Sequence, residues 1–342
     1  MDRAYDHNFV RQDSIHQPLY VITVVFNPKR YRTRWALYKK FEAHVIASGG
    51  TLYTVEVAFG ERDFVVTEPN NVQHLQLRTE NEIWIKENCI NLAVQRLPSD
   101  WKYFAYVDAD ITFARPDWVG ETLHQLQHYK IVQMFSEAQD LSYNYEPFMR
   151  HQGFVCSYLN NVPKPTLSQK GYYYLPTKTK DQPSIVTWHP GFCWSMDRDT
   201  YTRLGGLIDI GVLGASDNHM AKSLVGDGEY SYHPDVHQVY KNNVLKWQER
   251  ALYHVRKDIG YVNGLILHHW HGTKADRRYW DRWKILTEFQ FNPDTDLKKD
   301  WQGMYQLEDY DSRQIRLRDK IREYFALRNE DNIMLNPTEI KM

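Results

Sequence analysis

The stretch Tyr103–Asp110 reads YFAYVDAD and decides the fold that we predict for this chain. Its first five residues are apolar or aromatic and predict a short buried strand, which runs directly into two aspartates. Ligands of open α/β sheets bind beyond the carboxyl ends of the strands, so Asp108 and Asp110 are expected to face a binding crevice. Carboxylates in such a place hold Mg²⁺ or Mn²⁺, and the ion can bridge to a diphosphate. The alternative is a pair of surface aspartates that begin a turn before Pro116.

Strand and helix patterns alternate around this stretch. The β-branched run Tyr20–Phe26 (YVITVVF) predicts a buried strand, and Leu37–Val45 carries apolar residues four apart, as a helix does. Thr79, with Glu82 three residues later, predicts a capping box at the start of a further helix. This rhythm indicates a mostly parallel central sheet flanked by helices. The other predicted strands are Thr51–Val57, His74–Arg78 and Ile131–Phe135.

The second half of the chain has a different organisation. Residues 136–187 are rich in Tyr, Pro, Asn and Lys and weakly periodic, so we expect a long ordered loop over a binding site. Arg277–Asn329 predicts two helices joined by the polar segment Asn292–Asp300. No linker divides the chain cleanly. We therefore expect one domain with a first half at 1–135, a second half at 136–275 and a C-terminal helical extension at 276–342.

The composition excludes several kinds of protein. The formal net charge is -1, so nothing attracts the chain as a whole to nucleic acid or to an anionic membrane. The N-terminal residues carry charges without an apolar core, unlike a signal peptide. The longest apolar run, Val21–Phe26, is too short to span a bilayer. Three cysteines fit no disulfide or metal pattern, and we expect a cytoplasmic protein without a membrane span.

A second cluster of candidate ligands lies in Gly264–Lys274, which reads GLILHHWHGTK. If the strand predicted for LIL continues, His269 and His271 share one face and His268 points to the other. Neutral imidazole binds divalent transition metals, so His269 and His271 are candidate metal ligands beside the two aspartates. Lys274 is a candidate for neutralising a leaving diphosphate. Alternatively the histidines only form hydrogen bonds; a zinc hydrolase is disfavoured because no HExxH pattern occurs.

An HPGFCW motif at 189–194 offers candidates for substrate binding. His-Pro-Gly is turn chemistry that lets the backbone approach a ligand closely, and a tryptophan follows on a short predicted strand. We therefore select His189, Gly191 and Trp194 as candidate substrate-binding residues.

A carboxylate at the start of a later helix is the candidate catalytic residue. Small residues precede it, and Ser216 predicts the N-cap of a helix whose first turn contains Asp217. One interpretation is a partner of the helix dipole. The other, of equal weight, is a general base that takes the proton of an acceptor hydroxyl.

Taken in chain order, DAD at 108–110, HPGFCW at 189–194, GASDNH at 214–219 and HHWHGTK at 268–274 resemble the layout of the GT-A glycosyltransferases. The chain is also similar to a group of uncharacterised viral and phage glycosyltransferase-like proteins with DxD and HxWHG segments. The resemblance covers roughly Tyr20–Trp283. Several GT-A families show HxxGxxK, whereas the lysine here comes one residue earlier, which leaves open whether His269 or His271 binds the metal.

This resemblance implies a Rossmann-like GT-A fold that binds a nucleotide-sugar donor, with Mn²⁺ or Mg²⁺ held by Asp108, Asp110 and a late histidine. It places the nucleotide at the end of the first strand, where Asn27 and Arg34 are candidate contacts. For each of these contacts the alternative is a solvated surface residue. Further candidates on the helix that carries WIKEN are Lys86, Asn88 and Asn91.

The implied activity is the transfer of a sugar to the hydroxyl of an acceptor, which is a carbohydrate or another compound. Asp217 would deprotonate the acceptor, and direct displacement would invert the anomeric centre, with a retaining mechanism as the alternative. A nucleic-acid acceptor is left open, although the net charge does not support it. One alternative is a sugar-phosphate nucleotidyltransferase, but VFNPKRYR at 25–32 lacks the glycine-rich loop of those enzymes. Another is a catalytically inactive carbohydrate-binding module.

Overall fold

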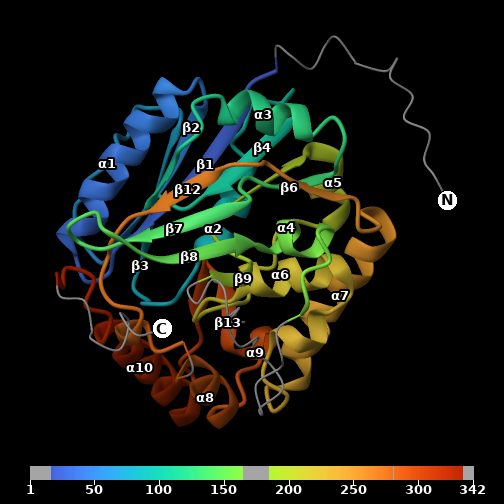
Figure 1. Ribbon diagram of the computed structural model, residues 1–342. Coiled ribbons are helices and arrows are strands. Elements are labelled where there is room, and N and C mark those ends of the chain that lie inside the picture. Colours follow the sequence, from blue (N-terminus) through green and yellow to red (C-terminus); the bar gives the residue numbers. More distant parts are fainter. Residues whose placement is uncertain (1–16, 165–184, 280, 334–342) are drawn as a thin grey trace.

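A central sheet of seven strands organises the computed structural model, which describes residues 17–164, 185–279 and 281–333 (Figure 1). Its strand order is β11-β6-β10-β4-β1-β2-β3. Neighbouring strands are parallel, except that β10 runs antiparallel to both β4 and β6. This arrangement confirms the predicted α/β class with a mostly parallel sheet. The strands are β1 (Leu19–Phe26), β2 (Thr51–Phe59), β3 (His74–Thr79), β4 (Tyr103–Val107), β6 (Ile131–Gln133), β10 (Cys193–Asp197) and β11 (Ile259–Tyr261).

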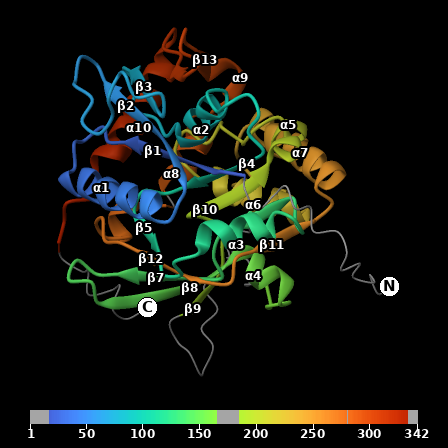
Figure 2. The same ribbon diagram turned by 90° about the horizontal axis from the view of Figure 1, so that it is seen from above.

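Different helices cover the two faces of this sheet, because successive side chains of a strand point to opposite faces. Leu19 and Val21 pack in one core with α1 and α3, whereas Tyr20 and Ile22 pack in the other with α2, α6 and α7. Figure 2 shows α1 and α3 on one side of the sheet and α2, α5 and α7 on the other. The helices are α1 (Arg32–Ala47), α2 (Lys86–Val94), α3 (Trp118–Gln125), α4 (Phe154–Leu159), α5 (Arg198–Leu204), α6 (Ser216–Val225) and α7 (Gln238–His254).

A second sheet, with the order β5-β12-β7-β8-β9, brings a late strand beside the DAD segment. β12 pairs with β5, which begins directly after Asp110, and in register with β7, so that His268 lies beside Asp140. The long loop predicted for 136–187 is therefore corrected: it contains β7, β8 and α4, and 165–184 lie outside the described residues. The strands are β5 (Ile111–Phe113), β7 (Glu137–Leu141), β8 (Pro147–Gly153), β9 (Ile185–His189) and β12 (Leu265–His268).

The C-terminal region adds two helices, as predicted, and they join the core of the central sheet. Phe325 of α10 packs edge-on against Phe26 of β1, with 6.0 Å between ring centroids. The segment between the helices is more regular than expected, since it contains a short helix and a hairpin. The elements are η3 (Ala275–Arg277), α8 (Asp281–Glu288), α9 (Pro293–Asp296), β13 (Leu297–Lys299), β14 (Tyr305–Leu307) and α10 (Ser312–Ala326).

Two predicted helix caps are wrong. Thr79 ends β3 and hydrogen-bonds Gln306, with 2.7 Å between the oxygens, while α2 begins only at Lys86. Ser216 is itself the first helical residue of α6, and Ala215 takes the N-cap position without a capping side chain. All three cysteines are buried and free. In the described part of the chain, no helix is long and apolar enough to cross a bilayer.

Candidate active site

A cavity of about 390 Å³ opens at the carboxyl ends of β1 and β4, where the sequence placed the binding crevice. Its wall combines segments that are far apart in the chain: the end of β1, α1, the DAD segment, the HPG turn, the start of α6 and the residues after β12. The predicted site residues among those that line it are Arg34, Lys86, Asp108, Asp110, His189, Gly191, Asp217, His271 and Lys274. The fold thus gathers most of the predicted site in one place.

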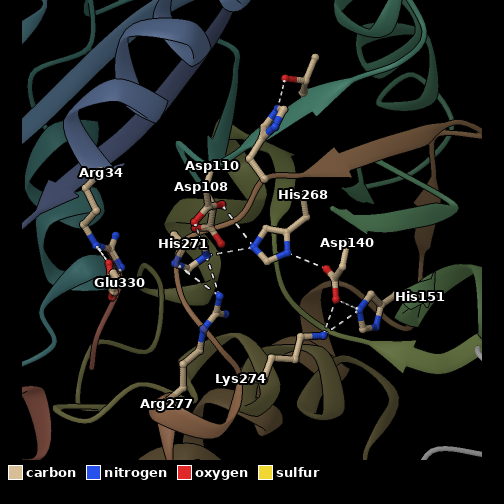
Figure 3. Close-up of polar contacts among 12 residues, drawn as sticks. Arg34, Asp108, Asp110, Asp140, His151, His268, His271, Lys274, Arg277 and Glu330 are labelled. Carbon is tan, nitrogen blue, oxygen red and sulfur yellow. Dashed lines mark hydrogen bonds and ion pairs between the residues drawn. The ribbon is translucent and has the colours of Figure 1, made fainter. Parts of the chain in front are cut away.

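One carboxylate and two imidazoles form a compact group of metal-ligand atoms (Figure 3). Ligand atoms of Asp110, His268 and His271 lie within 4.8 Å of one another. His271 Nε2 lies 3.1 Å from Asp110 Oδ2 and 3.1 Å from His268 Nε2. Asp110 Oδ1 is buried and forms no hydrogen bond with any described residue. A buried acceptor without a partner, facing two imidazole nitrogens, fits a divalent transition-metal ion.

The predicted pairing of His269 with His271 on one face is wrong. β12 ends at His268, so strand alternation does not continue through the following residues. His269 instead turns away from the group: its backbone N–H donates to the carbonyl of Asp110, and its Nε2 lies 2.8 Å from Thr112 Oγ1. His268 and His271 instead face each other, with 3.1 Å between their Nε2 atoms.

Asp140 on β7 contacts the ring nitrogen of His268 that does not face the metal-ligand group. Its Oδ1 lies 2.6 Å from His268 Nδ1, and its Oδ2 lies 2.7 Å from His151 Nε2 and also pairs with Lys274. Burial would raise the pKa of Asp140, but His151 and Lys274 hold that pKa well below its usual value. An ionised Asp140 keeps the proton of His268 on Nδ1, which leaves the Nε2 lone pair directed at the metal-ligand group.

Asp108, predicted as a metal ligand, is not a member of this metal-ligand group and instead pairs with Lys86, the first residue of α2. Glu87, the next residue, is buried and lines the same cavity. Burial raises the pKa of Glu87 to about 7, against the opposing effect of Lys86. Burial also raises the pKa of Asp108, in spite of Lys86. Lys86 thus acts on two carboxylates, those of Asp108 and Glu87, and Glu87 takes up a proton near neutral pH.

Asp217 and the HPG turn face each other across the cavity wall. A methyl group at Gly191 would lie only 3.0 Å from Asp217 Oδ2, so a residue without a side chain is needed for this approach. Asp217 Oδ1 accepts a hydrogen bond from the backbone N–H of Asn218 at 2.7 Å, which leaves Oδ2 toward the turn. The His189 ring stacks on Phe192 with 4.3 Å between centroids.

Trp194 supports the turn from outside the cavity. Its Nε1 donates to the carbonyl of Pro190 at 2.8 Å, and the described lining residues do not include it. Its predicted role in substrate binding is therefore corrected to a contact that fixes the turn.

Three predicted nucleotide contacts are placed elsewhere. The amide of Asn27 closes a turn by bonding both the N–H and the carbonyl of Tyr31, and it faces a separate small recess. Asn88 bonds the backbone of the β13–β14 hairpin at Gly303 and Tyr305. Asn91 bonds the backbone of Leu207. Neither Asn88 nor Asn91 is among the described residues that line the cavity, and their assignment as donor contacts is corrected.

Two residues of the site, Asp140 and His151, carried no recognisable signal in the sequence, whereas Arg277 follows the histidine cluster as one of three basic residues that could neutralise a diphosphate or begin a solvated helix. Asp140 and His151 lie in the segment predicted to be a loop, and only the strand register reveals their proximity to His268. Arg277 places its Nη2 2.8 Å from His271 Nε2. Burial, with Arg277 adding to the effect, lowers the pKa of His271 to about 4, so the imidazole is neutral at pH 7 and able to bind a metal.

No protein-family model matches the chain, and no curated protein matches its sequence. The catalytic domain of Drosophila β1,4-galactosyltransferase 7, solved in complex with xylobiose, is a structural match at 12% identity and a TM-score of 0.30, covering 62% of each chain. A nucleotide-diphospho-sugar transferase structure from Desulfovibrio desulfuricans G20 matches at 10% identity and a TM-score of 0.31, covering 73% of this chain and 81% of its own.

A 4-diphosphocytidyl-2C-methyl-D-erythritol synthase from Anaerococcus prevotii matches at 9% identity and a TM-score of 0.32, covering 74% of this chain and 89% of its own. The chain thus spans 62% of the length of the galactosyltransferase domain. At TM-scores this low none of these similarities supports an assignment of function, which has to come from the geometry of the site.

Proposed function

We propose that this chain is a metal-dependent glycosyltransferase of the GT-A kind, which transfers a sugar from a nucleotide-diphosphate sugar to an acceptor hydroxyl. The observation that carries the proposal is the group formed by Asp110, His268 and His271 at the carboxyl end of β4, facing a cavity that Asp217 also lines. Such a donor set favours Mn²⁺ or another transition metal over Mg²⁺, because two of its three members are imidazoles.

The residues have separate tasks in this proposal. Asp110, His268 and His271 would hold the ion, which supplies Lewis-acid stabilisation of the leaving diphosphate. Lys274 and Arg277 add positive charge on the same side of the cavity. Asp108 and Lys86, paired with each other, border the space for the donor sugar.

Asp217 acts on the acceptor. Its carboxylate takes the proton of the acceptor hydroxyl while the acceptor oxygen bonds to the anomeric carbon and the bond to the diphosphate breaks. Direct displacement of this kind inverts the anomeric centre. The acceptor is a carbohydrate or another hydroxyl compound.

The test is to incubate the protein with a panel of nucleotide sugars and Mn²⁺ and to measure the release of free nucleotide. We expect release with at least one donor, and its loss in EDTA and in Asp110→Asn, whose fold should persist. Full activity in EDTA would contradict the metal-dependent mechanism. Release of pyrophosphate from a nucleoside triphosphate and a sugar phosphate would favour the nucleotidyltransferase alternative, and binding of sugar without turnover would favour the inactive module.

A further inference from the structure

The segment Arg328–Asn332, which follows α10 and which we call the strap, returns to the metal-ligand group. Gly272, one residue after His271, has a φ of 85°, and a Cβ at this position would lie 2.4 Å from the carbonyl oxygen of Asn329. The indole N–H of Trp270 donates to the carbonyl of Asn332. The strap therefore packs directly on the backbone that presents His271.

The strap is also fastened to the start of α1. The carboxylate of Asp331 accepts hydrogen bonds from the backbone N–H groups of Arg32 and Thr33, both at 3.0 Å. Two backbone donors that the helix itself leaves unsatisfied are bonded in this way. As a result, the strap bridges the first helix of the chain and the segment that follows β12.

Between these anchors, Glu330 joins two arginines. Its carboxylate pairs with Arg34 through both Nε and Nη2, the latter at 2.8 Å, and lies 3.3 Å from Nε of Arg328. Glu330 is 4% exposed. Burial would raise the pKa of Glu330, but Arg34 and Arg328 lower it to about 2, so the carboxylate is ionised at neutral pH.

Glu330 can either position the two arginines or compete with a bound anion, depending on which side of the guanidinium groups its carboxylate lies. Arg34 and Arg328 line the cavity, whereas Glu330 is not among the described lining residues. The carboxylate thus contacts the two guanidinium groups on the side away from the cavity, and their other side faces the cavity. A carboxylate that competed with a bound anion would have to lie on the cavity side.

Positive charge is in excess on this wall. Arg277 is close enough to act electrostatically on Arg34 and Arg328, and its buried Nε has no hydrogen-bond partner among the described residues. Nε of Arg328 is likewise buried and forms no aligned hydrogen bond, although Glu330 is close. Buried guanidinium groups with unsatisfied donors are costly unless an anion binds, and phosphate oxygens match their planar arrangement of donors.

We propose that Arg34 and Arg328 form an anion clamp for a diphosphate group beside the metal-ligand group, and that Glu330 is the positioning residue of this clamp. Calling the diphosphate that of a nucleotide-sugar donor rests on the proposed function; the clamp itself requires only two linked phosphate groups. The strap then contributes Arg328 and Glu330 to the binding site, although it lies beyond α10.

The experiment is a calorimetric titration with inorganic pyrophosphate in EDTA, so that no metal contributes. The variants are Glu330→Gln and Arg328→Gln, and the matched control is Glu323→Gln, which removes an exposed carboxylate of α10 that pairs with Lys320. We expect Glu330→Gln and Arg328→Gln to weaken pyrophosphate binding about 10- to 100-fold and Glu323→Gln to leave it within about twofold. Melting temperatures identify a variant that has lost its fold, and Glu330→Asp should restore part of the affinity.

Each outcome bears on the clamp separately from the transferase activity. Unchanged pyrophosphate affinity in Arg328→Gln would overturn the clamp, and tighter binding in Glu330→Gln would show that Glu330 competes with the anion. Absence of pyrophosphate binding by the wild-type protein would also overturn it. Pyrophosphate binding with the expected variant pattern, without turnover of any nucleotide sugar, would support the clamp and contradict only the proposed function. Mn²⁺ affinity, titrated without pyrophosphate, should be the same in Glu330→Gln and the wild type.

Discussion

His268 directs its Nδ1 at Asp140 across 2.6 Å, and the two residues lie side by side in the register of β12 and β7. The carboxylate accepts a hydrogen bond from the Nδ1–H group and thereby fixes both the tautomer and the ring orientation of His268. His268 can then present only Nε2 toward Asp110 and His271. A strand pairing in the second sheet therefore determines the geometry of the candidate metal site.

Asp140→Asn tests this relationship. The amide keeps the shape of the side chain but lacks the charge that favours the Nδ1 proton of His268, so we expect Mn²⁺ affinity to fall about 10- to 100-fold. Calorimetric titration with Mn²⁺ measures the effect. Glu137→Gln is the matched control, because it changes a carboxylate of the same strand that pairs with the exposed Arg150. Equal affinity in Asp140→Asn and Glu137→Gln would contradict the role of Asp140.

Alanine variants of the three neighbouring histidines should differ in their Mn²⁺ affinity. We expect His268→Ala and His271→Ala each to remove most of the Mn²⁺ affinity, because each deletes one ligand of a three-member group. His269→Ala should keep it, because His269 contacts Thr112 on the other side of the segment. Titration of the three variants under one set of conditions checks this. Loss of Mn²⁺ affinity in His269→Ala alone would show that the ligand group is assigned wrongly.

Asp217→Asn distinguishes base catalysis from helix capping. The amide retains most hydrogen bonding but cannot accept a proton, so we expect a near-normal melting temperature and donor affinity, with sugar transfer reduced by at least ~10²-fold. Asp209→Asn serves as the control, since Asp209 bonds Asn91 and is not among the described residues that line the cavity. If Asp217→Asn transfers sugar at the wild-type rate, the mechanism is a retaining one or the base is another carboxylate, such as Glu87, which also lines the cavity.

Because of Glu330, the free energy of unfolding should depend on pH in the acid range. Its pKa in the folded protein is about 2, below the ordinary value of 4.5, so its stabilising contribution is complete above pH 4.5 and is lost as the pH falls through 2. A shift of this size corresponds to about 3 kcal/mol. Urea unfolding at several pH values should therefore show a difference between wild type and Glu330→Gln that is largest above pH 4.5 and shrinks toward pH 2. Glu323→Gln, which removes an exposed carboxylate of α10, should give a curve parallel to that of the wild type.

Local sequence patterns were sufficient for most strands of the central sheet, although not for β11 or for the antiparallel direction of β10, and for one half of the site. The apolar runs of β1 and β4 are continuous because strands buried on both faces need apolar residues at every position, and the position of the DAD segment follows from the end of β4. The same reasoning placed Asp217 in the first turn of a helix.

The rest of the site depends on pairings between distant segments, which leave no local pattern. His268 takes the place expected for His269, because regular strand alternation ends at His268. Asp140 lies in a stretch whose mixed composition concealed β7 and β8, because short strands with one exposed face alternate only weakly. Asn88 and Asn91 looked like solvent-facing residues of a helix, but the C-terminal hairpin and the loop at Leu207 cover them.

The contact between Arg34 and Glu330 joins residues 296 positions apart, and that between His268 and Asp140 spans 128 positions. Closing loops of this length costs entropy, so neither contact forms unless distant segments of the chain have come together. An ion or anion that binds at these contacts has no binding site in a partly folded chain. It therefore stabilises only molecules in which the beginning and the end of the described chain are in contact. Ligand-induced protection against heat or proteolysis would consequently measure how complete folding is, and a chain cut short before Glu330 would show none of the protection that pyrophosphate provides.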